Sequence, residues 1–461
     1  MAKIHSVLLK EDKCEGCTNC VKDCPTRAIR VHGGKANIKD DFCIDCAECI
    51  RTCEHNAKYI KAHDLKQIDN FKYSAALIPP SFYGQFTGTH DPRQIMSGLH
   101  KLGFTKVYNV AKAAEALTRR TVSFLGKQNK FYISSSCPVV VRFVQKMYPE
   151  LVDHLLPFKS PVEITAQRAH EEIKQETGLT ESEIGVFFIT PCSAKLTSVE
   201  MALGHKLSYL DGAIAVREIY DHLYPLLKKK NSEKCENKDD ENYKLEKKDS
   251  PIIPYAGIKW GQSGGEEDLL QLLEQLETLT ISGLEEVRKA LAELARNNLS
   301  GVKYLEMVSC PQGCVGGVLN VCNPYQAKHN IKTLARERGK KSKFVDRGHQ
   351  VLQDYDFALQ PGFSSDQRGE LDSDMDKALE KLARLEEVEE MLPGLNCASC
   401  GAPDCETLAE DIVKGQGQRT DCIFMLRQEI QRLAEQVSSL SQELPPVISE
   451  ENSYSGDEAE Q

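Results

Sequence analysis

The sequence has little of three features that would point to other classes of protein. No apolar run approaches the roughly 20 residues that a membrane-spanning helix needs, so we expect no membrane span. The formal net charge is −10, and no basic stripe offsets it, which argues against nucleic acid as a partner. Residues 1–6 lack the apolar core of a signal peptide. We therefore expect a cytoplasmic protein.

The chain is rich in cysteine. Its twelve histidines form no metal-ligand spacing, whereas most of its eighteen cysteines are clustered. A disulfide framework is not expected in the cytosol, because thiols there are kept reduced. Thiolate is therefore the ligand class to follow. Two cysteines stay outside every group, namely Cys235 and Cys322.

Length and hydrophobic patterning predict an α/β multidomain fold. A chain of 461 residues with 41% hydrophobic residues is too long for one ordinary core. Buried apolar runs at 75–79, 131–133 and 185–189 alternate with helical stretches, which predicts a largely parallel sheet. We expect a small α+β cysteine-rich module at 1–63 and a larger α/β domain at 64–360, with a charged insertion at 228–250. A second cysteine-rich domain is expected at 374–422, then a coiled-coil-like helix at 423–444 and a disordered acidic tail at 445–461.

The first module carries the same cysteine pattern twice. C-x2-C-x2-C-x3-C occurs at Cys14, Cys17, Cys20 and Cys24, and again at Cys43, Cys46, Cys49 and Cys53. It resembles the two-cluster bacterial ferredoxins, in which the fourth cysteine of each run ligates the other cluster. We expect two [4Fe–4S] clusters, one on Cys14, Cys17, Cys20 and Cys53 and one on Cys43, Cys46, Cys49 and Cys24. Structural zinc is the alternative, although zinc needs no such crossing.

Four further cysteines lie in three loops beside predicted strands, at Cys137, Cys192, Cys310 and Cys314. Loops at strand ends are where α/β sheets place their sites, so the four thiols could meet in one crevice. Each alone could be a buried apolar thiol. The flanking Pro and Gly residues, and a total that equals the ligand count of a cubane, favour a cluster.

Around these loops, residues of about 70–350 resemble the catalytic domain of [FeFe]-hydrogenases. The loops occur in the family's order, with further matches at Ser160-Pro161 and at 261–266. The resemblance implies a two-lobed α/β domain and a diiron subsite with CO and cyanide ligands, bridged by Cys314 to a [4Fe–4S] cubane on Cys137, Cys192, Cys310 and Cys314. It also implies that Lys195 contacts a cyanide ligand; the alternative is an ordinary surface lysine.

The sequence departs from catalytic members at several positions. Ser136 replaces a cysteine that relays protons, and a hydroxyl is a far weaker acid than a thiol of pKa about 8.5. Ser198 replaces a glutamate, Thr190 replaces a methionine, and 113–120 lacks an acidic pair. We therefore expect an iron hydrogenase-type oxidoreductase of low turnover, or an H2 sensor. The alternatives are a non-catalytic relay or assembly protein with only a [4Fe–4S] cluster at the central site, and an electron-transfer subunit of a larger redox complex.

The last cysteine group follows Leu392-Pro393-Gly394 with the spacing C-x2-C-x4-C-x16-C, at Cys397, Cys400, Cys405 and Cys422. It resembles the small [4Fe–4S] domain of corrinoid iron–sulfur proteins and of membrane electron-transport subunits. A fourth [4Fe–4S] cluster is therefore expected, with zinc as the alternative.

Beyond the last cysteine, apolar residues repeat at spacings of three and four, at Ile423, Leu426, Ile430, Leu433, Val437, Leu440 and Leu444. This seam predicts either a homodimer or signalling-partner contact through the 423–444 helix, or packing on its own domain. A soluble redox partner, either a ferredoxin or a subunit of a redox complex, is also expected.

Overall fold

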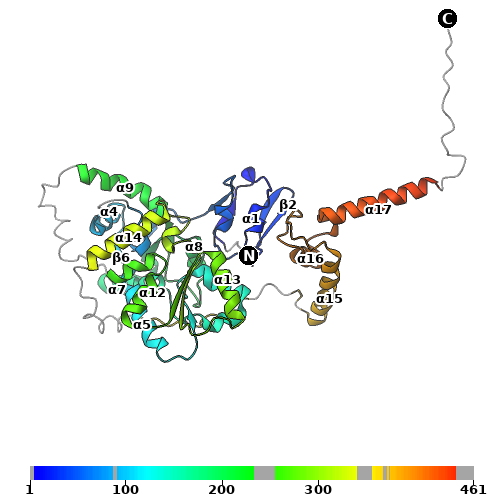
Figure 1. Ribbon diagram of the computed structural model, residues 1–461. Coiled ribbons are helices and arrows are strands. Elements are labelled where there is room, and N and C mark those ends of the chain that lie inside the picture. The colour runs from blue at the N-terminus through cyan, green and yellow to red at the C-terminus, as the bar shows by residue number, and fades with distance from the viewer. Residues whose placement is uncertain are drawn as a thin grey trace, which may run out of the picture. The chain divides into compact units, whose positions relative to one another are not determined.

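The computed structural model describes residues 5–86, 91–232, 255–339, 356–366, 371–372 and 374–442. The chain forms two compact units (Figure 1). The larger unit holds residues 1–15, 23–28 and 38–369, and the smaller holds 16–22, 29–37 and 370–461. Cys235, Leu444 and the predicted acidic tail lie outside the described residues. The domain limits given above stay predictions.

The larger unit is built on two parallel sheets. The first has the strand order β6-β5-β8-β9, with bounds Lys106–Asn109, Tyr73–Ile78, Ile184–Thr190 and Gly212–Ala215. Every residue of β8 is buried, as is typical of a central parallel strand with both faces covered. The second sheet has the order β10-β11-β7, with bounds Thr278–Ser282, Tyr304–Val308 and Tyr132–Ile133. The prediction of two-lobed α/β architecture with parallel strands is confirmed.

Helices surround these strands in Figure 1. Local sequence signals set their ends: α7 begins after Ser160, whose hydroxyl accepts a hydrogen bond from the Glu163 amide at 3.5 Å, and it ends at Gly178 with φ of 69°. The helices are α3 (Pro80–Tyr83), α4 (Pro92–Lys101), α5 (Ala111–Leu125), α6 (Pro138–Met147), α7 (Pro161–Thr177), α8 (Ser193–Glu200), α9 (Val216–Ser232), α11 (Tyr255–Ile258), α12 (Gly265–Leu273), α13 (Leu284–Ala295) and α14 (Pro324–Gly339). The predicted insertion at 228–250 thus begins inside α9, and its remainder lies outside the described residues.

Short elements make up the N-terminal module. Strand β1 (Val7–Leu9) pairs antiparallel with β4 (Lys58–Ile60), and β2 (Ile29–His32) pairs with β3 (Lys35–Ile38). One short helix lies in each cysteine run, α1 at Asn19–Lys22 and α2 at Glu48–Arg51. The small α+β module expected from the cysteine density is therefore present.

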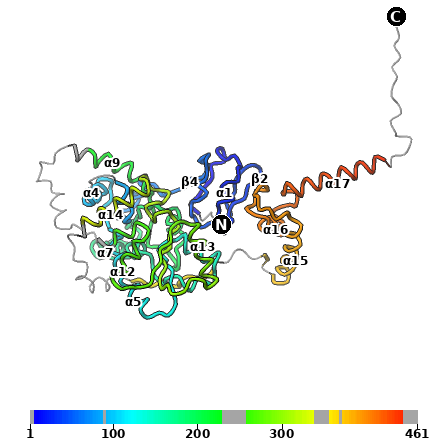
Figure 2. Tube along the Cα trace, in the orientation of Figure 1, coloured from blue at the N-terminus to red at the C-terminus, as the bar shows by residue number. Residues whose placement is uncertain are grey.

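In the smaller unit, β2 lies beside the C-terminal cysteine-rich segment (Figure 2). The unit contains α15 (Met375–Met391), α16 (Cys405–Val413) and α17 (Ile423–Gln442). A buried ion pair joins Arg30 of β2 to Asp411 of α16. The Val31 amide donates to the Gly401 carbonyl at 2.9 Å, and a Cβ at Gly401 would lie 1.9 Å from the Val31 carbonyl oxygen. Only glycine allows this approach.

Two further features concern the helices. Within the described part of the chain, we find no helix with the length and apolar character that a membrane span requires. Helix α17 buries none of its residues, and the seam residues within it are exposed, from 40% at Leu426 to 67% at Val437. Packing of this seam on its own domain is therefore not seen in the described part of the chain.

Candidate functional site

The four central cysteines line a single cavity of about 110 Å³. Cys137 follows β7 and precedes α6, Cys192 follows β8 and precedes α8, and Cys310 and Cys314 follow β11. The cavity lies where strands of both sheets end, which is the usual place of a site in an α/β fold. The structure thus brings together three loops that are far apart in the sequence.

Burial favours the neutral form of three thiols of this cavity, those of Cys192, Cys310 and Cys314. Burial, followed by the neighbouring Cys310 and Cys137, raises the pKa of Cys192 to about 12. Desolvation and the other three thiols also raise the pKa of Cys314, against a smaller opposing effect of Lys195. Neighbouring thiols with raised pKa values lose their protons together most readily beside a strong positive charge, as a bound metal supplies. This donor set fits an iron–sulfur cluster, whose ligands are thiolates.

Two polar side chains approach the sulfur atoms. The hydroxyl of Ser309 lies 3.6 Å from Cys137 Sγ and 4.0 Å from Cys310 Sγ. Arg51 Nη2 lies 3.7 Å from Cys310 Sγ and donates to the Gly316 carbonyl at 2.9 Å. Both residues were missed in the sequence. Ser309 adjoins a predicted ligand and could have been found, but nothing in the local sequence links Arg51 to a loop some 260 residues away.

The residues at which the chain departs from catalytic hydrogenases have local roles. Ser136 lines the cavity. Ser198 is buried, and its hydroxyl donates to the Ala194 carbonyl at 2.8 Å. The same hydroxyl accepts from Arg142 at 3.4 Å. The Thr190 hydroxyl accepts from the Cys192 amide and donates to the Cys192 carbonyl, both at 3.0 Å. Thr190 therefore closes the turn that carries Cys192, and Ser198 fixes α8.

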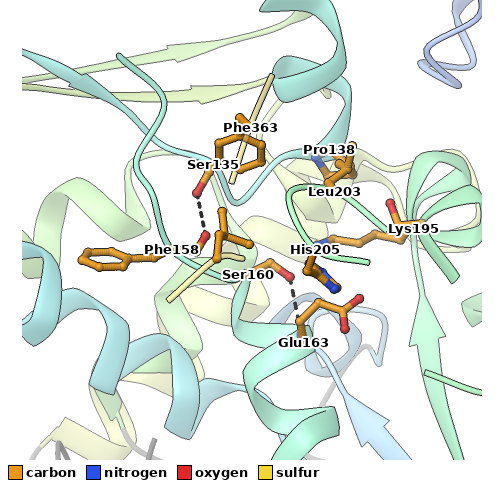
Figure 3. A pocket seen from close by; sticks show the side chains of 11 residues that line it. Ser135, Pro138, Phe158, Ser160, Glu163, Lys195, Leu203, His205 and Phe363 are labelled. Carbon is orange, nitrogen blue, oxygen red and sulfur yellow. Dashed lines mark hydrogen bonds between the residues drawn. The ribbon is translucent and has the colours of Figure 1, made fainter. Parts of the chain in front are cut away.

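Lys195 lies on α8 and lines both the central cavity and a second, smaller cavity of about 30 Å³ (Figure 3). In the second cavity, the Ser135 hydroxyl donates to the Phe158 carbonyl at 3.1 Å. The Glu163 carboxylate accepts from the Ser208 hydroxyl at 2.7 Å and from the Tyr209 amide at 3.0 Å. Each of these groups has a hydrogen-bond partner, and Lys195 is a cation at the wall of both cavities.

The two cysteine runs of the N-terminal module have matching local geometry. The Ala28 amide donates to Cys24 Sγ at 3.1 Å, and the Ala57 amide donates to Cys53 Sγ at 3.2 Å. Positive φ angles occur at equivalent positions of both runs, in the pairs Gly16 and Asp45, Thr18 and Ala47, and Arg27 and Asn56. Loops of this kind turn successive main-chain amides toward an anionic centre, such as the sulfides of a cluster.

Cys24 lies close to the second cysteine run. Burial raises the pKa of Cys46, and the next contributions come from Cys24 and Cys49, with a smaller one from Cys43. The structure therefore brings together the four thiols Cys24, Cys43, Cys46 and Cys49, as the crossing of a bacterial ferredoxin requires. Of the other predicted set, Cys14 and Cys20 are buried, Cys17 is exposed and Cys53 is half-buried, and that grouping stays a prediction.

The loop of the second run is fixed to the central site. The Ser193 hydroxyl donates to the Asp45 carbonyl at 2.6 Å, and the Thr197 hydroxyl donates to the Asp45 carboxylate at 2.7 Å. Cys46 packs on the same apolar cluster as Cys137 and Cys192. The second ferredoxin loop and the central cavity thus form one continuous packed region.

The C-terminal cysteines gather around a separate small core. Cys400, Cys405 and Cys422 pack with it, and Cys397 is exposed. Burial raises the pKa of Cys400, with smaller contributions from Cys422 and Cys397. The Cys405 amide donates to Asn396 Oδ1 at 2.8 Å, which ties the third cysteine to the loop of the first. Cys322 is a half-buried free thiol that packs against the apolar core around β5, β8 and β9, and it joins none of the described cysteine groups.

Comparison with known families matches each of these regions. Residues 72–318 match the family described as iron only hydrogenase large subunit, C-terminal domain. Residues 6–54 match a 4Fe-4S dicluster domain, and 392–424 match a putative Fe-S cluster domain. These matches support iron–sulfur cofactors.

Individual relatives are more distant. Iron hydrogenase 1 of Clostridium pasteurianum is 24% identical over 49% of this chain and 44% of its own length. The periplasmic [Fe] hydrogenase large subunit of Nitratidesulfovibrio vulgaris is 29% identical over 42% and 51%. This chain therefore spans about half the length of these curated relatives. A solved variant of [FeFe]-hydrogenase HydA1 from Chlamydomonas reinhardtii aligns with a TM-score of 0.45 and 15% identity, covering 66% of this chain and 98% of that one.

The family match covers more than half of the chain and includes Cys137, Cys192, Cys310 and Cys314. With the iron–sulfur domains on either side of it, the chain is an iron–sulfur, hydrogenase-like protein and belongs to the iron-only hydrogenase large-subunit family.

Proposed function

We propose that the protein carries out slow H2 chemistry, 2H⁺ + 2e⁻ ⇌ H2, or reports H2 binding, at a site held by the four central thiols. The observation that carries the proposal is the convergence of Cys137, Cys192, Cys310 and Cys314 on one cavity. In this proposal all four hold a [4Fe–4S] cluster, and Cys314 also holds a diiron unit with CO and cyanide ligands. When bound, that unit supplies the metal at which H2 is formed or split.

The chain's own residues prepare the cavity for this task. Lys195 places a cation at the cavity wall, where it favours negative charge on bound ligands. Arg51 and Ser309 approach the sulfur atoms, and both favour the thiolate form of Cys310 against the effect of its burial. The lining is otherwise largely apolar, with Val162, Phe188 and Trp260 among its residues, so water is restricted there.

Electrons would reach the cavity from the N-terminal module. The contacts of Asp45 with α8 and the packing of Cys46 beside Cys137 and Cys192 support a short route from the second ferredoxin cluster. The proposed cofactors are then four [4Fe–4S] clusters, with two in the N-terminal module, one in the centre and one on Cys397, Cys400, Cys405 and Cys422. A ferredoxin or a subunit of a redox complex would be the external partner.

Low turnover is part of the proposal. Ser136 lines the cavity at the position where catalytic relatives carry a proton-relaying cysteine, and its hydroxyl does not titrate near neutral pH. Ser198 is buried and donates to a main-chain carbonyl, so it does not replace the missing glutamate. Because these two residues weaken proton transfer, a non-catalytic electron relay with a plain [4Fe–4S] cluster at the centre is the second candidate.

The exposed seam of α17 supports a homodimer. Its residues alternate between β-branched Ile423, Ile430 and Val437 and the leucines Leu426, Leu433 and Leu440. β-Branched residues at one core position and leucine at the other favour parallel two-stranded coiled coils. We therefore propose a second copy of this chain as the partner of α17. We also propose a cytoplasmic setting, because thiols there are kept reduced and stay available as cluster ligands.

Infrared spectroscopy tests the proposal directly. The full chain would be matured anaerobically with hydrogenase assembly factors, and the stretches of metal-bound CO and cyanide would be recorded. We expect these bands in the native chain and their loss in Cys314→Ser, with Cys322→Ser as the matched control that keeps them. Native protein with the iron content of four cubanes but without the bands would favour the relay.

A further inference from the structure

Two buried carboxylates line the same cavity as the four central thiols. Glu266, the second residue of α12, is 5% exposed, and Glu306 of β11 is 2% exposed. A buried carboxylate must be satisfied by hydrogen bonds, by a cation or by a proton. The contacts of the two residues show that each meets this requirement in a different way.

Glu306 is bound by two main-chain amides. One of its oxygens accepts from the Gly264 amide at 2.9 Å and the other from the Glu267 amide at 2.8 Å. Main-chain amides can only donate, so both oxygens must accept. The amides belong to the start of α12, where the helix dipole also favours negative charge. These donors therefore favour the charged form of Glu306.

Glu266 has partners of another kind. Its two oxygens accept from the hydroxyl of Tyr304 and from that of Ser134, the latter at 2.9 Å. A hydroxyl can rotate to donate or to accept. The network therefore stays satisfied whether Glu266 is ionised or carries a proton, because either hydroxyl can accept the acid proton. Ser134 also accepts from the Ser136 amide at 3.4 Å, which links the network to the loop of Cys137.

Electrostatics favour one proton on the pair. Burial raises its pKa, and the hydrogen bonds from Tyr304 and Ser134 offset part of that rise. Burial, and then the charge of Glu266, likewise raise the pKa of Glu306, because the two carboxylates repel each other. The pair thus favours one negative charge over two. The amides favour the charge on Glu306, whereas the hydroxyl partners of Glu266 suit both of its forms, so we assign the exchangeable proton to Glu266.

Few other charges face the pair. Glu267 of α12 adds a negative charge near Glu306, and Lys328 of α14 adds a positive one. Across the cavity lie Lys195 and the four thiols. The charged groups of α5, which packs on α12, are engaged with other residues: Arg119 pairs with Glu115, Arg120 lies over the Phe158 ring, and Lys112 interacts with Arg168 and Glu172.

We propose that Glu266 is the proton-exchanging group of the central cavity. When a cluster held by the four thiols is reduced by one electron from the ferredoxin module, the Glu266 carboxylate would take up one proton from solvent and become a carboxylic acid. When the electron leaves, the proton is released. The inference rests on the part of the proposed function that puts a cluster on the four thiols, and it does not require the diiron unit. Because Ser136 and Ser198 stand where catalytic relatives carry titratable residues, Glu266 would supply the carboxyl proton donor at this cavity.

Redox titration of the full chain, followed by electron paramagnetic resonance at several pH values, tests this inference. Reduction that takes up a proton becomes harder as the pH rises, so the midpoint potential of the central cluster should fall with pH in the native protein. In Glu266→Gln this dependence should disappear, because glutamine keeps the shape and the hydrogen bonds but does not titrate. Glu267→Gln is the matched control. Its carboxylate also accepts from hydroxyls, those of Thr278 and Thr280, and it should leave the dependence unchanged.

Infrared difference spectra give a second measure that does not depend on turnover. Reduction should produce the carbonyl band of a neutral carboxylic acid, which shifts in D2O and is missing in Glu266→Gln. If that variant does not retain its iron, Tyr304→Phe replaces it. Loss of the tyrosine donor removes a hydrogen bond to the charged form, so the pH window should move upward.

A pH dependence that persists in Glu266→Gln would overturn the inference, as would reduction without a carboxylic acid band. Failure of the proposed H2 chemistry looks different. In that case the CO and cyanide bands would be missing, while the pH dependence would still be lost in Glu266→Gln.

Discussion

Arg51 provides a direct test of how the N-terminal module acts on the central site. Its guanidinium lies 3.7 Å from Cys310 Sγ and its side chain is 28% exposed. At an effective dielectric constant of about 20, a unit charge at that distance contributes about 4.5 kcal/mol. The added electron of a reduced cubane is shared over its four irons. The guanidinium would therefore stabilise the reduced form by about a quarter to a half of that energy, or about 1–2 kcal/mol. We expect Arg51→Gln to lower the midpoint potential of the central cluster by about 40–90 mV.

The assay is a redox titration monitored by electron paramagnetic resonance, with the N-terminal clusters as internal references. Glu48 pairs with Arg51 at 3.3 Å. Burial raises the pKa of the Cys310 thiol, Arg51 lowers it, and Glu48 raises it further. Glu48→Gln should therefore raise the potential. Arg51→Lys keeps the charge and should change it least. An unchanged or higher potential in Arg51→Gln would refute the electrostatic reasoning.

Three further predictions concern the proton route, the C-terminal domain and the partner helix. Ser136→Cys puts a titratable thiol at the cavity wall, and it should raise H2 turnover by roughly tenfold or more in matured protein; equal rates would show that Ser136 is not the sole block. Asp411→Asn leaves the buried guanidinium of Arg30 without its countercharge and should destabilise the smaller unit by about 3–5 kcal/mol in urea unfolding, whereas a loss below about 1 kcal/mol would contradict a buried pair. Ile430→Lys should convert a dimer to a monomer in light scattering, while Gln431→Lys, beside the seam, should not; a native monomer would rule out the seam as an interface.

Much of the fold could be predicted because its signals are local. The apolar runs near 75–79 and 185–189 became β5 and β8, since a strand buried on both faces needs continuous apolar residues. Cysteine spacing located the loops, because a cubane constrains its ligands to short, glycine- or proline-flanked turns.

Long-range contacts could not be predicted in this way. Nothing in the local sequence indicates that Arg51 reaches the Cys310 loop, or that Arg30 pairs with Asp411 in a different cysteine-rich segment. The roles of Glu266 and Glu306 depend on whether their neighbours are hydroxyls or main-chain amides. Such partners are set by tertiary packing, which periodicity and spacing do not record.

In the proposed function, H2 chemistry at the four-thiol cavity exchanges electrons with the N-terminal clusters. The most direct test exposes matured, oxidised protein to H2 alone and follows the N-terminal clusters by electron paramagnetic resonance. We predict that their reduced signals appear slowly under H2, and that they do not appear under argon or in Cys314→Ser. If the CO and cyanide bands are present but the clusters stay oxidised under H2, while dithionite still reduces them, the account is contradicted.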